Sequence, residues 1–293
     1  MSPISWPAPA KLNLFLHITG RRADGYHSLQ TLFQFLDLGD ALQFTPRNDG
    51  RICRINTIEG VAEQDDLTIR AAQLLQRHTG VSQGADIRIN KILPQGGGLG
   101  GGSSDAATTL TALNCIWGTG LSRPELAQLG LQLGADVPVF VLGHSAWAEG
   151  IGEVLSDIDL PEPWYVVIHP GVHVSTAALF AAPELTRDAR PITIRDYLAG
   201  RACNVFESLV KARYPEVAQA LEWLSRQSGR QARMTGSGSC IFVALDSEQQ
   251  AKTLAQAVAH PSVAQPWQSF YARGVNRSPL ISVADALVAT ISG

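Results

Sequence analysis

Apolar and polar residues alternate near the start of the chain with the two-residue period of a β-strand. From residue 11 to residue 18 the even positions are leucine or isoleucine, and the odd positions are mixed. This alternation predicts a strand with one apolar face and one mixed face. Further strands are predicted at 29–38, 41–45 and 87–93. Between them, Asp65 or Asp66 can cap a helix that Gly80 ends.

A glycine-rich segment comes next, followed by a predicted helix at 105–117. The residues on the apolar face of this helix are Ala106, Leu110, Leu113 and Trp117. Ser122 and Glu125 form a capping box, which predicts another helix that runs through Leu133. Residues 137–142 are apolar without interruption, and we predict a buried strand there.

The composition changes around residues 157–163, where Asp, Pro and Glu gather. We therefore predict two domains, 1–157 and 158–293. The second domain is expected to contain a strand at 164–169, helices up to about 228, strands at 231–235 and 240–245, a helix after Ser247 and a strand at 269–273. The order β, α, β, β, α, β is typical of a split βαβ sandwich, so the predicted fold class is α+β.

Composition excludes several classes of protein. The formal net charge is -3, from 23 basic and 26 acidic residues, and no long block of like charge occurs. We therefore expect no nucleic-acid or membrane partner. The four cysteines are widely spaced and have no histidine at zinc spacing, which suits a reducing cytoplasm. The beginning of the chain does not resemble a signal peptide, and its apolar stretches are too short for a membrane span.

The glycine-rich segment is the strongest functional signal from the residues themselves. It lies between a predicted strand and a helix N-terminus, where free N–H groups and the helix dipole attract anions. Consecutive glycines also let a ligand approach the backbone closely. The segment is therefore expected to bind phosphate. Its residues are Pro94, Gln95, Gly96, Gly97, Gly98, Leu99, Gly100, Gly101, Gly102, Ser103 and Ser104.

Three interpretations of this segment compete. A P-loop would need a lysine before its final serine, and Gly102 occupies that position. Gly96, Gly98 and Gly101 match the GxGxxG pattern of dinucleotide-binding proteins, but the acid expected about 20 residues later is Glu125, inside a capping box. A flexible linker without a ligand is the third interpretation, and so many glycines would make it costly to order.

The segment, with Asp105-Ala106-Ala107 after it, resembles the phosphate motif of the GHMP kinases, which include galactokinase and the homoserine and mevalonate kinases. Residues 9–14 resemble the N-terminal motif of that family, and residues 234–240 resemble its third, glycine-rich motif. Within the family, residues 24–27 and 134–140 look like the branch whose substrate is 4-diphosphocytidyl-2-C-methyl-D-erythritol. The likeness extends from about residue 6 to residue 280.

The resemblance implies a ribosomal-S5-like N-terminal domain, a ferredoxin-like C-terminal domain and an active site between them. It also implies an ATP-dependent transfer of phosphate to the 2-hydroxyl of the cytidyl substrate, giving the 2-phosphate and ADP, in the non-mevalonate pathway to isoprenoids. Mg²⁺ is expected with ATP, although no protein ligand for it can be nominated. We expect a cytoplasmic monomer or weak homodimer.

Two residues match the catalytic pair of the family. Asp136 would accept the proton of the attacking hydroxyl, and the cation of Lys11 would stabilise charge beside it. From the residues alone, Asp136 could instead cap a turn, and Lys11 could be a solvent-facing lysine of a strand.

The other family positions would bind substrate. The resemblance implies that Tyr26 and Phe180 stack on the cytosine and that His27 bonds its edge, with Phe33 a weaker candidate in the same pocket. For the two phenylalanines, core packing is the alternative. The remaining candidates are Asn13, Thr235, Gly236 and Gly238, of which the last three could equally form a plain hairpin turn.

The adenine contacts are less defined, because Asp66 stands where the family often has asparagine. Three other functions stay open at this point: another GHMP kinase, an NAD-dependent dehydrogenase, and a relative that binds nucleotide without catalysis. The pair Tyr26 and His27 argues against kinases of substrates that carry no base. The presence of both Lys11 and Asp136 argues against a non-catalytic relative.

Overall fold

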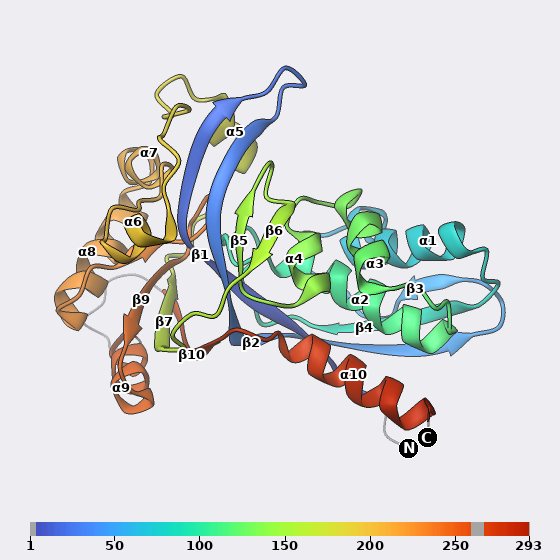
Figure 1. The fold of residues 1–293 in the computed structure, drawn as a ribbon. Coiled ribbons are helices and arrows are strands. Elements are labelled where there is room, and N and C mark those ends of the chain that lie inside the picture. The colour runs from blue at the N-terminus through green and yellow to red at the C-terminus, as the bar shows by residue number, and fades with distance from the viewer. Residues whose placement is uncertain (1–3, 259–266, 293) are drawn as a thin grey trace.

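The computed structural model describes residues 4–258 and 267–292. Its central feature is a long antiparallel pair, β1 (Trp6–Arg21) and β2 (His27–Arg47), which stands between two groups of helices (Figure 1). The two strands predicted at 29–38 and 41–45 are one strand, β2. Gly39 explains the continuity, because a Cβ there would lie 2.2 Å from the Ala8 carbonyl oxygen, so only glycine lets the two backbones pair.

The N-terminal half packs helices against β1, β2 and the strands that extend their sheet. β4 (Gly84–Asn90) and β5 (Ala146–Glu149) each pair with β2, β3 (Ile52–Arg54) pairs with β4, and β6 (Val154–Asp157) pairs with β5. The helices are the 3₁₀ turn η1 (Glu63–Asp65), α1 (Leu67–Thr79), α2 (Gly101–Trp117), α3 (Arg123–Leu131) and α4 (Val137–Leu142). Phe35, Leu110 and Phe140 are fully buried in the core between them.

The prediction of a strand at 137–142 is wrong, because this segment is the helix α4. Pro138 lies in the first helical turn, where N–H groups have no partner within the helix, so the missing N–H of proline costs no hydrogen bond. Gly143 ends the helix with a left-handed φ of 73°. The helix is buried almost all round, so its sequence carries no period that distinguishes a short helix from a buried strand.

The C-terminal half confirms the split βαβ order. Its antiparallel sheet has the order β10-β7-β9-β8. The strands are β7 (Trp164–His169), β8 (Arg233–Met234), β9 (Ile241–Leu245) and β10 (Gln268–Val275), and the helices are α5 (Thr176–Ala181), α6 (Ile194–Leu198), α7 (Glu207–Arg213), α8 (Pro215–Ser228) and α9 (Glu248–Val258). β10 also pairs with β2 and so joins the two halves in one sheet.

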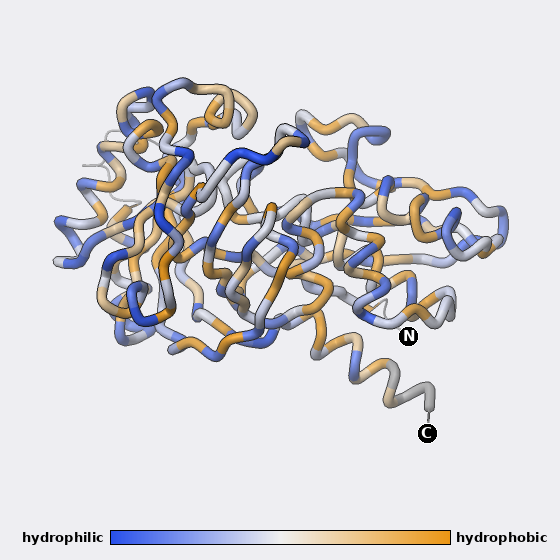
Figure 2. The backbone as a smooth tube through the Cα atoms, turned by 45° about the horizontal axis from the view of Figure 1, so that its top comes forward, coloured by the Kyte–Doolittle hydropathy of each residue, from blue (hydrophilic) through white to orange (hydrophobic). Residues whose placement is uncertain are grey.

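The last helix, α10 (Pro279–Ser292), was not predicted. It extends from the body of the molecule in Figure 2, where most of its coloured part is hydrophobic and shorter stretches are hydrophilic. Leu280 and Ala284 pack in the core of the N-terminal half, so the end of the chain returns to that half. The boundary after residue 157 stays a prediction. Within residues 4–258 and 267–292, no helix combines the length and the apolar character that crossing a membrane requires.

Candidate active site

The glycine-rich segment divides into a loop and the first turn of a helix. α2 begins at Gly101, four residues earlier than predicted, with Gly100 as its N-cap. Gly96, Gly98 and Gly100 have φ values of 66°, 79° and 73°, which residues with a Cβ rarely adopt. The loop therefore depends on glycine for its conformation, and it ends where the free N–H groups of α2 begin.

Close contacts hold this loop between the two halves of the molecule. The Lys11 N–H donates to Leu99 O, and the Cys240 N–H donates to Gly97 O, both at 3.0 Å. A Cβ on Gly98 would lie 2.3 Å from Thr235 O. The loop is thus clamped by β1 on one side and by the turn between β8 and β9 on the other.

The ammonium group of Lys11 lies against this loop. Lys11 Nζ donates to Asn13 Oδ1 at 2.5 Å and to Gly98 O at 3.1 Å, and it lies 3.3 Å from Asp136 Oδ2. Its side chain is 4% exposed, so it is not a solvent-facing strand lysine. The structure therefore fixes a buried cation between the loop and a carboxylate.

The Asp136 carboxylate is available for chemistry. Asp136 stands at the N-cap position of α4, but its side chain makes no capping hydrogen bond within the described part of the chain. Its side chain is 35% exposed and lines a large cavity. The alternative, that Asp136 serves only as a turn or helix cap, is therefore not supported.

Two cavities meet at the glycine loop. The larger, of about 680 Å³, is lined by Lys11, Asn13 and Asp136 at one end and by Tyr26, His27 and Phe180 at the other. The smaller, of about 350 Å³, is lined by Asp65, Asp66, Lys91 and residues 94–103. Gly96, Gly98 and Gly100 line both cavities, so the loop forms their common wall.

The aromatic end of the larger cavity contains three of the predicted residues. The rings of His27 and Phe180 stack with centroids 4.9 Å apart and 23° between their planes, while Tyr26 is 61% exposed. His27 Nε2 is buried without a hydrogen-bond partner among the described residues. Burial lowers the pKa of His27, assisted by Arg187 and Arg21, so the ring is neutral at neutral pH. Phe180 thus faces His27 rather than Tyr26.

Phe33 lines the same cavity as Tyr26, His27 and Phe180, but at its other end. Its ring is 1% exposed, and the ammonium of Lys11 lies 5.4 Å from its centroid. The structure therefore places Phe33 at the Lys11 end of the cavity, where it contributes a cation–π contact, and not beside Tyr26 and His27.

The three predicted residues between β8 and β9 differ in position. Thr235 Oγ1 accepts from the Asn13 N–H at 2.9 Å and lies 3.3 Å from Gly98 O, so it joins β1 to the glycine loop. Gly236 lines the larger cavity, but Thr235 and Gly238 do not. A Cβ on Gly238 would instead meet Met234 Sδ at 2.7 Å. These residues form a hairpin turn, of which only Gly236 lines the larger cavity.

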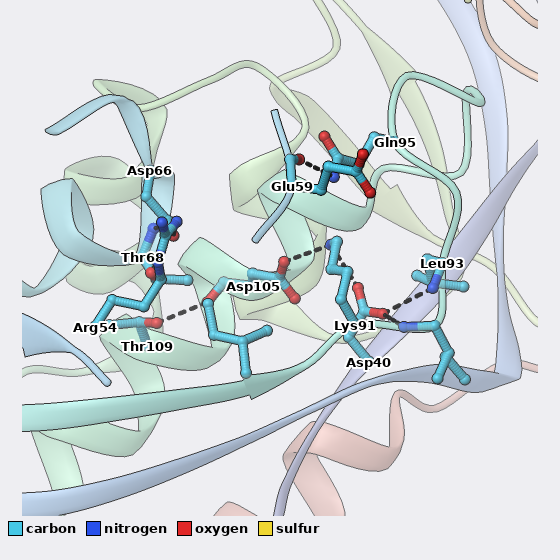
Figure 3. A network of polar contacts seen from close by, with 12 residues as sticks. Asp40, Arg54, Glu59, Asp66, Thr68, Lys91, Leu93, Gln95, Asp105 and Thr109 are labelled. Atoms are coloured by element: carbon cyan, nitrogen blue, oxygen red, sulfur yellow. Dashed lines mark hydrogen bonds and ion pairs between the residues drawn. The ribbon is translucent and has the colours of Figure 1, made fainter. Parts of the chain in front are cut away.

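Several residues of the site gave no signal in the sequence. Asn204 Nδ2 donates to Met234 O and Gly236 O, and so it holds the β8–β9 turn. Lys91 Nζ lies 2.6 Å from both Asp40 Oδ2 and Asp105 Oδ2, beneath the glycine loop (Figure 3). Asp105 follows the phosphate motif, but Asn204, Asp40 and Lys91 belong to no motif, and only the fold brings them to the site.

Asp66 is engaged by its own surroundings. Its Oδ1 accepts from the Thr68 N–H at 2.9 Å and caps α1, as predicted for Asp65 or Asp66, and Oδ2 pairs with Arg54 Nη1 at 2.7 Å. Its carboxylate is therefore a structural part of the smaller cavity wall.

Comparison with known proteins identifies the family. The family described as GHMP kinases N terminal domain matches residues 66–144, and GHMP kinases C terminal matches residues 182–262. A 4-diphosphocytidyl-2-C-methyl-D-erythritol kinase of Nitrosococcus oceani is 59% identical over 94% of this chain and 96% of its own length. A protein of the same name from Halorhodospira halophila is 54% identical over 96% of both chains.

Solved structures agree. A crystal structure of 4-(cytidine 5'-diphospho)-2C-methyl-D-erythritol kinase has a TM-score of 0.79 and 33% identity, covering 92% of this chain and 99% of its own. A mevalonate kinase structure, at 16% identity over 94% of this chain and 100% of its own, shares the fold with a TM-score of 0.65. The chain therefore belongs to the GHMP kinases and, within them, to the family of 4-diphosphocytidyl-2-C-methyl-D-erythritol kinases.

Proposed function

We propose that this chain transfers the γ-phosphoryl group of ATP to the 2-hydroxyl of 4-diphosphocytidyl-2-C-methyl-D-erythritol, in the non-mevalonate pathway to isoprenoids. Family membership supports the reaction. One observation supports the substrate: a single cavity runs from Lys11 and Asp136 to Tyr26, His27 and Phe180. A substrate with an alcohol at one end and a nucleobase at the other suits a cavity with these two ends.

The proposed arrangement places ATP in the smaller cavity, with its phosphates against residues 96–102. The N–H groups at the start of α2 and the glycine backbone would bind the phosphate oxygens. The γ-phosphoryl group would then lie at the glycine loop, which forms the wall common to both cavities, and would face the larger cavity. Lys11, which contacts Gly98 O, lies where charge develops on the transferred group.

Asp136 is the proposed base. Its carboxylate lies in the larger cavity beside Lys11 Nζ, and a substrate hydroxyl bonded to it would point its oxygen toward the loop. The carboxylate would orient the hydroxyl and accept its proton as the oxygen attacks phosphorus. Asn13, which fixes Lys11 through Oδ1, would position the same group.

Mg²⁺ is proposed to enter with ATP. Among the described residues no group of three or more acidic, histidine or cysteine side chains could hold a metal ion. We therefore propose that phosphate oxygens and water supply most of the Mg²⁺ ligands. The ion would neutralise phosphate charge.

The decisive assay for this function is coupled release of ADP by the purified protein. We expect turnover with the cytidyl substrate and none above background with mevalonate or homoserine, because these alcohols lack a base for the aromatic end of the cavity. Turnover with mevalonate or homoserine, but not with the cytidyl substrate, would contradict the assignment.

Replacing Phe180 by alanine should weaken binding of the cytidyl substrate selectively. Loss of the ring removes a stacking surface, which is worth about 1–3 kcal/mol per base, so KM should rise roughly 5- to 150-fold. KM for ATP should stay within about twofold, because Phe180 lines only the larger cavity. Steady-state kinetics with each substrate varied in turn would test this, and an equal rise in both KM values would count against the proposed base site.

The proposed site is complete within one chain, since both halves contribute to the larger cavity. We propose that the protein acts in the cytoplasm as a monomer or weak homodimer, without nucleic-acid or membrane partners.

A further inference from the structure

Three charged side chains meet beneath the glycine loop (Figure 3). Lys91 follows β4, Asp40 belongs to β2, and Asp105 lies in α2. Lys91 Nζ contacts Asp40 Oδ2 and Asp105 Oδ2 at 2.6 Å each. Asp40 and Asp105 are buried, and the Lys91 side chain is 19% exposed. We call these residues the Asp40–Lys91–Asp105 triad.

The triad fixes both ends of the loop. Asp40 Oδ1 accepts hydrogen bonds from the N–H groups of Ile92 and Leu93, at 2.6 and 2.8 Å, immediately before the loop begins. Asp105 belongs to the helix into which the loop runs. Through Lys91, the triad therefore connects the segment before the loop, the helix after it and the central strand β2.

Lys91 also faces the proposed nucleotide cavity. It lines the smaller cavity with the loop, and a Cβ on Gly101 would lie 3.1 Å from Lys91 Nζ. An ammonium group has three N–H donors, and two of them are directed to the carboxylates. The third donor and the charge are available to a phosphate at Gly101. Lys91 is thus placed where its charge would serve a bound phosphate, as the lysine within a P-loop does.

With all three groups ionised, the triad carries a net negative charge, which disfavours a polyphosphate beside it. Two carboxylates share one ammonium, and Asp105 Oδ1 is buried with no hydrogen-bond partner among the described residues. The nearby start of α1 adds Asp66, whose carboxylate pairs with Arg54. An unpartnered buried carboxylate oxygen is the natural position for a proton when further negative charge arrives.

The electrostatics of Asp105 agree with this geometry. Burial raises the pKa of the Asp105 carboxyl to about 7; Lys91 opposes the rise, and Asp40 and Asp66 add to it. Burial also disfavours the charged form of Lys91, but its two carboxylates outweigh burial and raise its pKa. Lys91 therefore stays charged, and phosphate groups close to Asp105 would raise the pKa of its carboxyl further.

We propose that Lys91 is a phosphate-binding residue of the nucleotide site, and that Asp105 takes up a proton when the nucleotide binds. The proton comes from water or buffer and forms an O–H bond at Oδ1, and no bond to the nucleotide is made or broken. Neutral Asp105 then holds Lys91 less strongly, so its ammonium is shared between Asp40 and phosphate. The inference rests on the proposed function, because it assumes that ATP occupies the smaller cavity.

Calorimetric titration with a non-hydrolysable ATP analogue tests the proton. Measurements at pH 8 in two buffers of different ionisation enthalpy give the number of protons taken up. Per bound nucleotide, the wild-type chain should take up at least about half a proton more than the Asp105→Asn variant, in which this group cannot titrate. Asp188→Asn is the control, because Asp188 is an exposed carboxylate that lines neither cavity, so its loss should leave uptake unchanged.

Two further variants test Lys91. Lys91→Gln should raise the Kd of the ATP analogue at least about tenfold, while KM for the cytidyl substrate stays within about twofold. Should the single variant fold poorly, Lys91→Gln combined with Asp105→Asn restores the local charge balance, and it should bind the analogue at least about tenfold more weakly than Asp105→Asn alone. Lys211→Gln, at an exposed lysine outside both cavities, is the control.

The outcomes separate the two proposals. Equal proton uptake by the wild type and Asp105→Asn would overturn the role of Asp105. Binding of the analogue by the double variant as strong as by Asp105→Asn alone would overturn the role of Lys91. A wild-type chain that binds no ATP analogue, although it is folded, would refute the proposed function itself.

Discussion

Replacing Asp136 by asparagine should reduce kcat by about 10²- to 10⁴-fold, the usual contribution of a positioned general base. Asparagine has nearly the same shape but cannot accept the proton of the substrate hydroxyl. The fold should survive, because the ammonium of Lys11 keeps its contacts with Asn13 Oδ1 and Gly98 O. Nucleotide binding should change little, because Asp136 lines the larger cavity and not the smaller one.

Turnover and binding must be measured separately to test this prediction. Single-turnover assays with saturating substrates give the loss in the chemical step, and titration with an ATP analogue gives the Kd, which should stay within about threefold of the wild type. An active Asp136→Asn enzyme, together with an inactive Lys11→Met enzyme, would refute the role of Asp136 as base. That result would instead mean that Lys11 supplies most of the stabilisation and that the hydroxyl loses its proton late.

Features encoded by a few neighbouring residues could be predicted from the sequence. The capping box of Ser122 and Glu125 is present at the start of α3, and Asp66 and Gly80 cap α1 as expected. The glycine-rich segment can be identified because its backbone has a positive φ at three positions, each of which requires glycine. Local chemistry of this kind does not depend on the rest of the fold.

Features that depend on tertiary packing could not be predicted in this way. The helix α4 reads as a strand because burial on all sides removes its helical period. Phe33 and Phe180 are both apolar rings, and only the paths of β2 and α5 place one beside Lys11 and the other on His27. Asp40 and Lys91 are 51 residues apart and meet only because β2 and β4 pair.

Replacing Gly98 by alanine should disable the site more severely than its single added methyl group suggests. Gly98 has a φ of 79°, and its new Cβ would lie 2.3 Å from Thr235 O, which is backbone and cannot rotate away. The loop must therefore shift, and with it Gly98 O, which binds Lys11 Nζ and faces Thr235 Oγ1. One substitution would thus displace the phosphate loop and the ammonium together.

We expect Gly98→Ala to lose at least about 100-fold in kcat/KM, because misplacement of reacting groups by about 1 Å can have that effect. The left-handed conformation should lower the free energy of unfolding by a further 1–2 kcal/mol, approximately the strain of one such residue. Gly229→Ala separates the two effects: Gly229 has a φ of 65° at the end of α8, but a Cβ there meets no atom within 4 Å. The control should therefore show the loss of stability in thermal or denaturant unfolding while keeping full activity. If Gly98→Ala retained the activity of Gly229→Ala, the close contact between the loop and Thr235 would not be needed for catalysis.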